Sequence, residues 1–113
     1  MRFVTLFSHG PHWKYGKSVY EQGPVMEDHL RSMRRRFDEG SLLVGGPFDE
    51  GGGIAFLEAP DRDAATAIID ADPAVRAGVL SYTLHRLHAY FDAVASTRAE
   101  LSVAELAALR TEG

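Results

Sequence analysis

The sequence predicts an α+β fold, a ferredoxin-like βαββαβ arrangement around an antiparallel four-stranded sheet. Four short runs rich in β-branched and aromatic residues alternate, in that order, with two stretches whose apolar residues recur at helical spacing. Glycine and proline separate these runs, as is typical of turns. A length of 113 residues and a hydrophobic fraction of 45% fit a single globular domain with a real core.

The first strand is expected at residues 2–8, RFVTLFS, which precede the breaker Gly10-Pro11. A long loop follows up to residue 23, and loops of this length in compact domains are often functional. The junction of strand and loop reads FSHGPHW, with two histidines and the only tryptophan of the chain. A strand end needs only one turn residue, so this cluster is a candidate site.

A helix is expected from Gly23-Pro24 to Gly40, because proline suits the first helical position. The apolar residues of this helix recur at spacings of four, three and four, which predicts one buried stripe. The stripe consists of Met26, Leu30, Met33 and Phe37.

Two short strands, SLLVGG at residues 41–46 and GIAFLE at residues 53–58, flank turn residues suited to a hairpin. Asp61 is expected to cap a second helix, which ends near Asp72 because a proline follows. The inward residues of that helix are expected to be Ala65, Ile68 and Ile69. The last strand lies in GVLSYTLHRLHAYF, residues 78–91.

The strands are apolar on both faces, whereas the two helices of this topology cover only one face. The opposing sets are Phe3 and Phe7 against Val4 and Leu6, and Leu42 and Val44 against Leu43. A sheet that is apolar on both faces needs a second covering layer, and this chain has no segment large enough to provide it. We therefore expect a homodimer, a dimeric α+β barrel in which two sheets pack face to face.

Residues 1–91 are expected to form the ferredoxin-like domain, and residues 92–113 a C-terminal extension with an extra helix. In LSVAELAALRTEG, Ser102 and Glu105 have the spacing of a capping box, which predicts a short helix.

Composition excludes several classes of function. Without cysteine, the chain has no disulfide framework, thiolate zinc site or cysteine nucleophile. A net charge of −4 disfavours nucleic acid as a partner. The N-terminal apolar run is too short for a secretory signal, and no stretch has the length of a membrane span. We expect a cytoplasmic protein with a small-molecule ligand and no membrane or nucleic-acid partner.

The predicted topology gathers polar residues at one end of the sheet, where the first strand ends and the first helix begins. His29 and Asp72 are the pair singled out there, because a carboxylate that accepts from one imidazole nitrogen leaves the other nitrogen free as a general base. The alternative is a structural pair, a partly buried histidine tied to a helix-ending aspartate. His9 is the expected second acid or hydrogen-bond donor.

Other residues at this end are expected to line a ligand pocket. Trp13 is suited to stacking on a planar ligand, although it is equally suited to holding the long loop on the core. The expected substrate-binding residues are His12, Trp13, Tyr15 and Gln22 of the loop, and Pro47 and Phe48 of the hairpin GGPFDEGGG.

Metal binding is a minority interpretation. His9 and His12 straddle a turn and have room to converge, but a zinc or iron site usually adds a third ligand, for which His29 or Asp72 would be needed. His85 and His88 are three apart on a strand and point to opposite faces. No metal and no cofactor are therefore expected.

Several segments, taken in order, carry a family resemblance. They are SHGPHW, EQGPVMEDHL, DEGSLLVGGP, GGGIAFLE and DADPAVRAGVLSY. Together they resemble the YciI-like, or YCII-related, family over roughly residues 2–91. The resemblance implies a ferredoxin-like dimer and a His-Asp dyad at His29 and Asp72. One branch of that family resembles a dehydrochlorinase of a chlorinated hydroxyhydroquinone, which implies elimination from an aromatic or polyhydroxylated ring.

Three functions are compatible with these residues. The leading hypothesis is a cofactor-independent lyase or isomerase in which His29 abstracts a proton from an aromatic or polyketide-like metabolite. The second is a non-catalytic ligand-binding or accessory dimer that uses the same pocket. The third is a metal-dependent or cofactor-free oxygenase.

Overall fold

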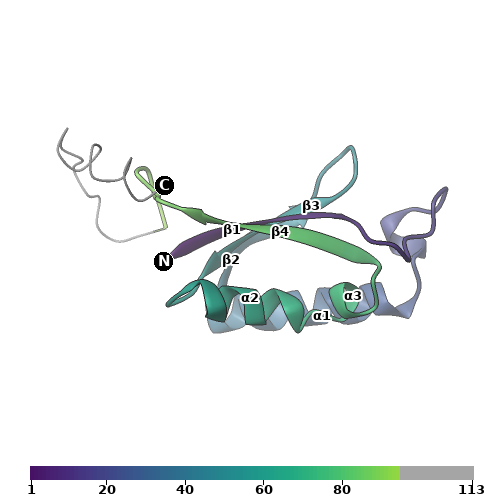
Figure 1. Cartoon of the computed structure of the whole chain (residues 1–113), viewed down its shortest axis with the longest axis horizontal. Coiled ribbons are helices and arrows are strands. Elements are labelled where there is room, and N and C mark those ends of the chain that lie inside the picture. The colour runs from purple at the N-terminus through teal and green to yellow at the C-terminus, as the bar shows by residue number, and fades with distance from the viewer. Residues whose placement is uncertain (95–113) are drawn as a thin grey trace.

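The structure, a computed structural model, describes residues 1–94 and has the predicted α+β, ferredoxin-like fold (Figure 1). The strand order is β2-β3-β1-β4, and all neighbouring strands are antiparallel. The predicted C-terminal helix lies outside the described residues. In chain order the elements are β1 (Arg2–His9), the 3₁₀ turn η1 (Val19–Glu21), α1 (Pro24–Glu39), β2 (Leu42–Pro47), β3 (Gly53–Glu58), α2 (Arg62–Asp70), α3 (Pro73–Arg76) and β4 (Leu80–Leu87).

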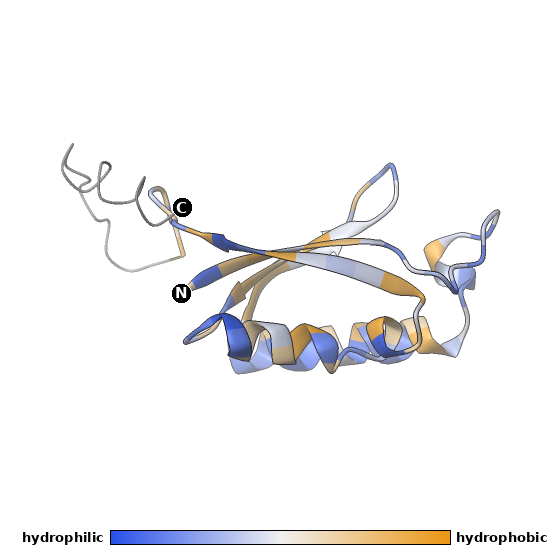
Figure 2. Cartoon of the chain, in the orientation of Figure 1, coloured by the Kyte–Doolittle hydropathy of each residue, from blue (hydrophilic) through white to orange (hydrophobic). Residues whose placement is uncertain are grey.

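The described helices all lie against one face of the sheet, and none covers the other face (Figure 1). The core fills the space between the two layers, and in Figure 2 the hydrophilic residues of the helices face away from the sheet. The most deeply buried apolar side chains of the core are Phe3, Leu57, Ala65, Ile69 and Ala74. No helix among residues 1–94 has the length and apolarity to cross a bilayer.

The predicted bounds of the first helix and the predicted start of the second helix are confirmed. Pro24 is the first residue of α1, and Gly40 ends this helix with a φ of 87°, a left-handed conformation that glycine adopts without strain. At the start of α2, Asp61 accepts a hydrogen bond from the backbone N–H of Ala64 at 2.8 Å. The apolar stripe of α1 is only partly buried, because Leu30 and Phe37 are 58% and 54% exposed.

The expectation that Leu42 and Val44 share a face is wrong. Leu42 pairs with Leu57 on the helix side of the sheet, whereas Val44 pairs with Phe56. A register shift between Leu42 and Val44 adds one residue to β2, and such a bulge turns the following side chains to the opposite face. Val44 therefore lies on the bare face.

The segment before the last strand also differs from expectation. The second helix ends at Asp70, and a separate short helix, α3, starts at Pro73. Asp72 consequently caps the start of α3 and does not close α2. The last strand is shorter than predicted, because β4 ends at Leu87.

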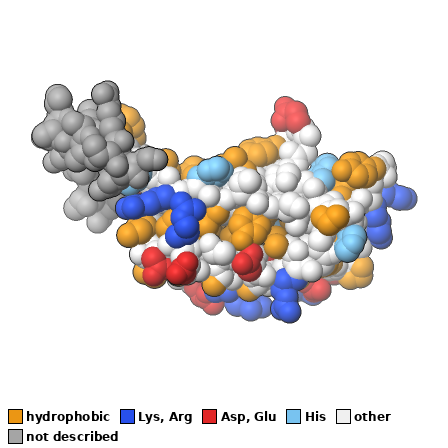
Figure 3. All heavy atoms as spheres, viewed as in Figure 1, with side chains coloured by type: hydrophobic (Ala, Val, Ile, Leu, Met, Phe, Trp, Pro, Cys, Tyr) orange, Lys and Arg blue, Asp and Glu red, His pale blue; other side chains and the backbone are white. Residues whose placement is uncertain are grey.

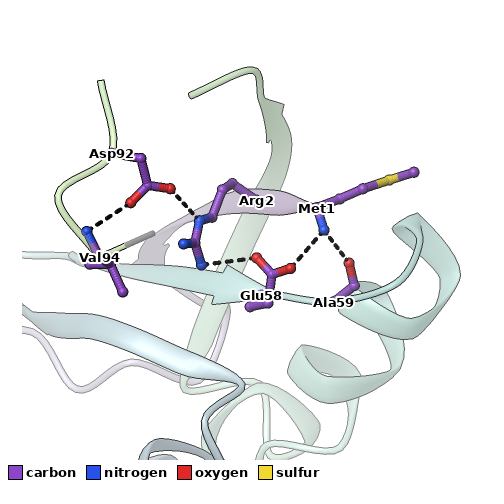
Figure 4. A network of polar contacts seen from close by, with 6 residues as sticks. All are labelled: Met1, Arg2, Glu58, Ala59, Asp92 and Val94. Carbon is purple, nitrogen blue, oxygen red and sulfur yellow. Dashed lines mark hydrogen bonds and ion pairs between the residues drawn. The ribbon is translucent and has the colours of Figure 1, made fainter. Parts of the chain in front are cut away.

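Ion pairs join the start of β1 to the end of β3 and to the chain after β4 (Figure 4). The Met1 amine donates to Glu58 and to the Ala59 carbonyl, both at 2.9 Å. Arg2 donates to Glu58 at 2.9 Å and to Asp92 at 2.7 Å. This network lies at the end of the sheet opposite to the predicted site, so it anchors the termini of the sheet and not the pocket.

Candidate active site

A cavity of about 570 Å³ lies between the sheet and α1, at the end where β1 leaves the sheet. Cavities that bind small molecules commonly enclose about 300–1,000 Å³. Its walls come from four parts of the chain: the inner face of the sheet, α1, the β1–α1 loop and the β2–β3 turn. Representative lining residues are Phe7, Trp13, Met26, His29, Leu42 and Phe48.

His29, on the second turn of α1, is the most deeply placed titratable side chain of the cavity wall. Its Nδ1 lies 2.8 Å from both carboxylate oxygens of Asp72, a residue 43 positions away in sequence. The His29 side chain is 12% exposed and lines the cavity, whereas the Asp72 side chain is fully buried. Phe7 meets the His29 ring edge-on, with ring centroids 5.8 Å apart, and supports it from the sheet side.

Asp72 is held by the backbone as well as by His29. As the residue that caps α3, it accepts hydrogen bonds at Oδ2 from the N–H groups of Ala74 at 3.1 Å and Val75 at 3.3 Å. Pro73 at the first helical position starts α3 directly after it. A buried carboxylate is tolerated when it is hydrogen-bonded in this way.

The partners of His29 determine its tautomer. An ionised carboxylate only accepts hydrogen bonds, so Nδ1 of His29 carries the proton that points at Asp72. In the neutral ring, Nε2 then has the lone pair. With this tautomer, Nε2 of His29 is a proton acceptor on a side chain that lines the cavity.

An aromatic wall, formed by His9, Trp13 and Tyr15, stands on another side of the same cavity. The rings of His9 and Trp13 stack in parallel, with centroids 3.9 Å apart and an interplanar angle of 4°. Tyr15 meets His9 edge-on at 5.9 Å. The structure thus brings His9, Trp13 and Tyr15 to the cavity that His29 lines.

The β2–β3 turn forms the adjoining side of the mouth, because a Cβ at Gly51 would lie 3.4 Å from Nε2 of His9. Pro47 and Phe48, for which the sequence predicts substrate binding, line the cavity there. Asp49 and Glu50 follow them at the tip of this turn, where acidic side chains stand out from the surface in Figure 3. The mouth is therefore acidic on the hairpin side, while the β1–α1 loop contributes Lys17.

Two predicted site residues lie elsewhere. The Nδ1 of His12 contacts the Ala77 carbonyl at 2.8 Å, so its side chain attaches the β1–α1 loop to the end of α3. Gln22 is only 3% exposed and is bonded to the backbone of its own loop, at Lys14 in both directions and at the carbonyls of Lys17 and Ser18. Both side chains are engaged with backbone groups, and neither is among the residues that line the cavity.

Three cavity residues from α1, Met26, Leu30 and Met33, were interpreted from the sequence as core. Their spacing is the same in a core stripe and in a pocket wall, so no local signal distinguishes the two. Within residues 1–94, no group of three or more potential ligands among His, Asp and Glu is arranged to hold a metal ion. His9 stacks on Trp13, whereas Nδ1 of His12 contacts the Ala77 carbonyl.

Comparisons with known proteins agree with the fold. The sequence profile described as the YCII-related domain matches residues 1–87. A similar solved structure is that of 5-chloro-2-hydroxyhydroquinone dehydrochlorinase from Burkholderia phenoliruptrix AC1100, in complex with 2,5-dihydroxybenzoquinone. The two chains are 20% identical, the match covers 77% of this chain and 93% of the other, and the TM-score is 0.59. No curated protein sequence matches the chain.

Proposed function

Because the chain belongs to the YCII-related domain family, we propose that it is a small cofactor-independent lyase or isomerase that acts on an aromatic or polyketide-like metabolite. One observation carries the proposal: His29 lines the cavity while its Nδ1 lies 2.8 Å from the fully buried carboxylate of Asp72. An imidazole oriented by a carboxylate in this way is suited to act as a general base.

The reaction starts with transfer of a substrate proton to Nε2 of His29. In an elimination, the electron pair left by this proton forms a new double bond in the ring system, and the leaving group departs with its bonding electrons. In an isomerisation, the imidazolium returns the proton to another carbon. Asp72 remains a carboxylate throughout and stabilises the imidazolium, which is the role that carboxylates have in comparable triads.

The remaining walls suit a planar substrate. Stacking rings such as those of His9 and Trp13 favour flat aromatic ligands over aliphatic ones. His9 adds a polar ring at the mouth, and we assign to it the second hydrogen-bond donor for a substrate oxygen. The similar dehydrochlorinase structure holds a dihydroxylated quinone, which is a flat ring of this chemical class.

We also propose that the protein is a homodimer. The face of the sheet without helices carries partly exposed apolar side chains, including Leu6, Val44 and Leu87, which are 40%, 56% and 37% exposed. Packing against the same face of a second copy removes this surface from water. Sedimentation analysis tests this proposal, and a monomer at micromolar concentrations contradicts it.

The enzyme proposal is tested by chloride release from 5-chloro-2-hydroxyhydroquinone and related ring compounds that carry a leaving group. We expect turnover by the wild type and a rate about 10²–10⁴-fold lower for His29→Gln, because a positioned general base typically contributes that factor. Asp70→Asn is the control, since Asp70 contacts Tyr82 and not His29. Binding of 2,5-dihydroxybenzoquinone without turnover of any compound would indicate a non-catalytic binding protein instead.

A further inference from the structure

One row of helix-facing side chains becomes smaller toward the edge of the sheet, where its last two members, Ala55 and Gly45, line the cavity. Across the strands, Thr5 of β1 pairs with Ala55 of β3, which pairs with Gly45 of β2. Thr5 and Ala55 are fully buried on the helix side, so this row faces α1. The neighbouring row on the same face consists of the larger side chains of Phe3, Leu57 and Leu42. The absence of a side chain at Gly45 therefore leaves space between the edge strand and α1.

The backbone itself requires several glycines of this hairpin, but not Gly45. Gly51 and Gly52 have φ values of 99° and 73°, which side chains rarely adopt. At Gly53 a Cβ would lie 2.8 Å from the carbonyl oxygen of Gly46. Gly45 has no positive φ, and a Cβ there would meet the Leu42 side chain at 3.3 Å and a backbone oxygen at 3.4 Å. A Cβ at this position therefore requires the Leu42 methyl groups to move by a few tenths of an ångström.

Glycine usually weakens a strand, because it loses more backbone entropy than other residues and has no side chain to pack. At Gly45 neither backbone conformation nor close backbone approach offsets this cost. The feature that a side chain would change is the cavity, which Gly45 lines together with Ala55 and Leu42. The residue at position 45 therefore affects how much space a ligand has in the cavity.

We infer that Gly45 determines the size of the ring system that the cavity accepts, and that a ligand with two fused rings binds more tightly than a single ring. This inference rests on the proposed function, which makes the cavity a site for planar compounds. A volume of about 570 Å³ lies in the range of sites for drug-sized ligands, so a single ring leaves much of it unfilled. Exposed apolar residues at the mouth, Tyr20 at 82% and Leu30 at 58%, offer further contact area to a larger ligand.

The test compares catechol with 2,3-dihydroxynaphthalene, which differ by one fused ring, by calorimetric titration. Wild type is expected to bind the two-ring compound at least about tenfold more tightly, because the second ring buries additional apolar area. Gly45→Val is expected to weaken the two-ring compound about tenfold or more, because the added methyl groups overpack the cavity, and to leave catechol within about threefold. Gly45→Ala should lie between the two.

Val44→Ile is the matched control, because it adds bulk to the same strand on the opposite face of the sheet. It is expected to bind both compounds as wild type does. Equal effects of Gly45→Val on both compounds, or no effect on either, would overturn the inference while leaving the proposed function intact. If wild type binds neither compound but turns over other rings in a His29-dependent manner, the inference on ring size fails alone. If wild type neither binds nor turns over any ring compound, both the inference on ring size and the proposed function fail.

Discussion

Asp72 contacts Nδ1 of His29 with both of its carboxylate oxygens at 2.8 Å, and it is fully buried behind the imidazole. The carboxylate also caps α3, so one side chain starts a helix and orients the histidine of another helix. The start of α3 and the side chain of His29 on α1 are therefore held by the same carboxylate.

Asp72→Asn is expected to reverse the tautomer of His29. An amide has a donor in place of one carboxylate oxygen, so it allows Nδ1 to accept and places the proton on Nε2, where it blocks proton abstraction. Turnover should fall by about 10²–10⁴-fold. Long-range ¹H–¹⁵N NMR of the imidazole reports the tautomer directly.

Asp70→Asn is the control for that change, since it alters the same functional group two residues earlier and outside the cavity. An Asp72→Asn protein that keeps the Nδ1–H tautomer and the wild-type rate would show that the carboxylate has a structural role only.

His9→Ala is expected to shift the emission of Trp13 to longer wavelength. The imidazole covers one face of the indole at 3.9 Å, and its removal exposes that face to water. Trp13 is the only tryptophan of the chain, so the fluorescence spectrum reports this site alone. His9→Phe restores a stacking ring, worth about 0.5–1.5 kcal/mol, and should restore the emission maximum. Identical spectra for wild type and His9→Ala would contradict the stacked geometry.

Tyr82 is expected to titrate late and to make stability pH-dependent at alkaline pH. Its hydroxyl donates to Asp70 at 2.6 Å, and this bond, together with burial and the nearby negative charge, raises the pKa of Tyr82 from 10.0 to about 12. Between these values the unfolded chain has lost the proton that the folded chain retains, so the stabilisation is complete below pH 10 and is lost as pH rises toward 12.

Phenolate absorbance and urea unfolding measure these two effects. Tyr82→Phe should remove a phenolate titration near pH 12 and flatten the decline in the free energy of unfolding across this pH window. A titration of Tyr82 near pH 10 would contradict the hydrogen bond.

Thr5→Val is expected to stabilise the protein. The Thr5 hydroxyl is buried on the helix side of the sheet and has no hydrogen-bond partner within the described residues. Replacing an unsatisfied buried hydroxyl by a methyl group of similar size should raise the free energy of unfolding by up to about 1 kcal/mol. Thr5→Ser, which keeps the hydroxyl and removes the methyl group, should lower it. Loss of stability in Thr5→Val would reveal a partner such as an ordered water.

Interactions within a few residues of the chain determined the bounds of α1 and the start of α2. A proline at the first helical position marks the start of α1 at Pro24, a left-handed glycine marks its end at Gly40, and a capping carboxylate starts α2 after Asp61. The apolar pattern of GIAFLE matches β3 residue for residue. The order of these elements, and therefore the end of the sheet at which polar residues gather, follows from sequence alone, because each signal acts on its own stretch of backbone.

Only the tertiary structure decided which of those polar side chains meet in one cavity. The sequence predicts ligand contacts for both His12 and Gln22. In the structure His12 contacts a backbone carbonyl 65 residues away, and Gln22 is hydrogen-bonded to the backbone of its own loop. The bulge in β2, which moves Val44 to the bare face, depends on pairing with β3. Met26 belongs to the buried core and also lines the cavity, whereas Leu30, which has the same core spacing, lines the cavity and is 58% exposed. In each case the side chain's partner comes from another part of the fold, so its role depends on contacts that local sequence does not specify.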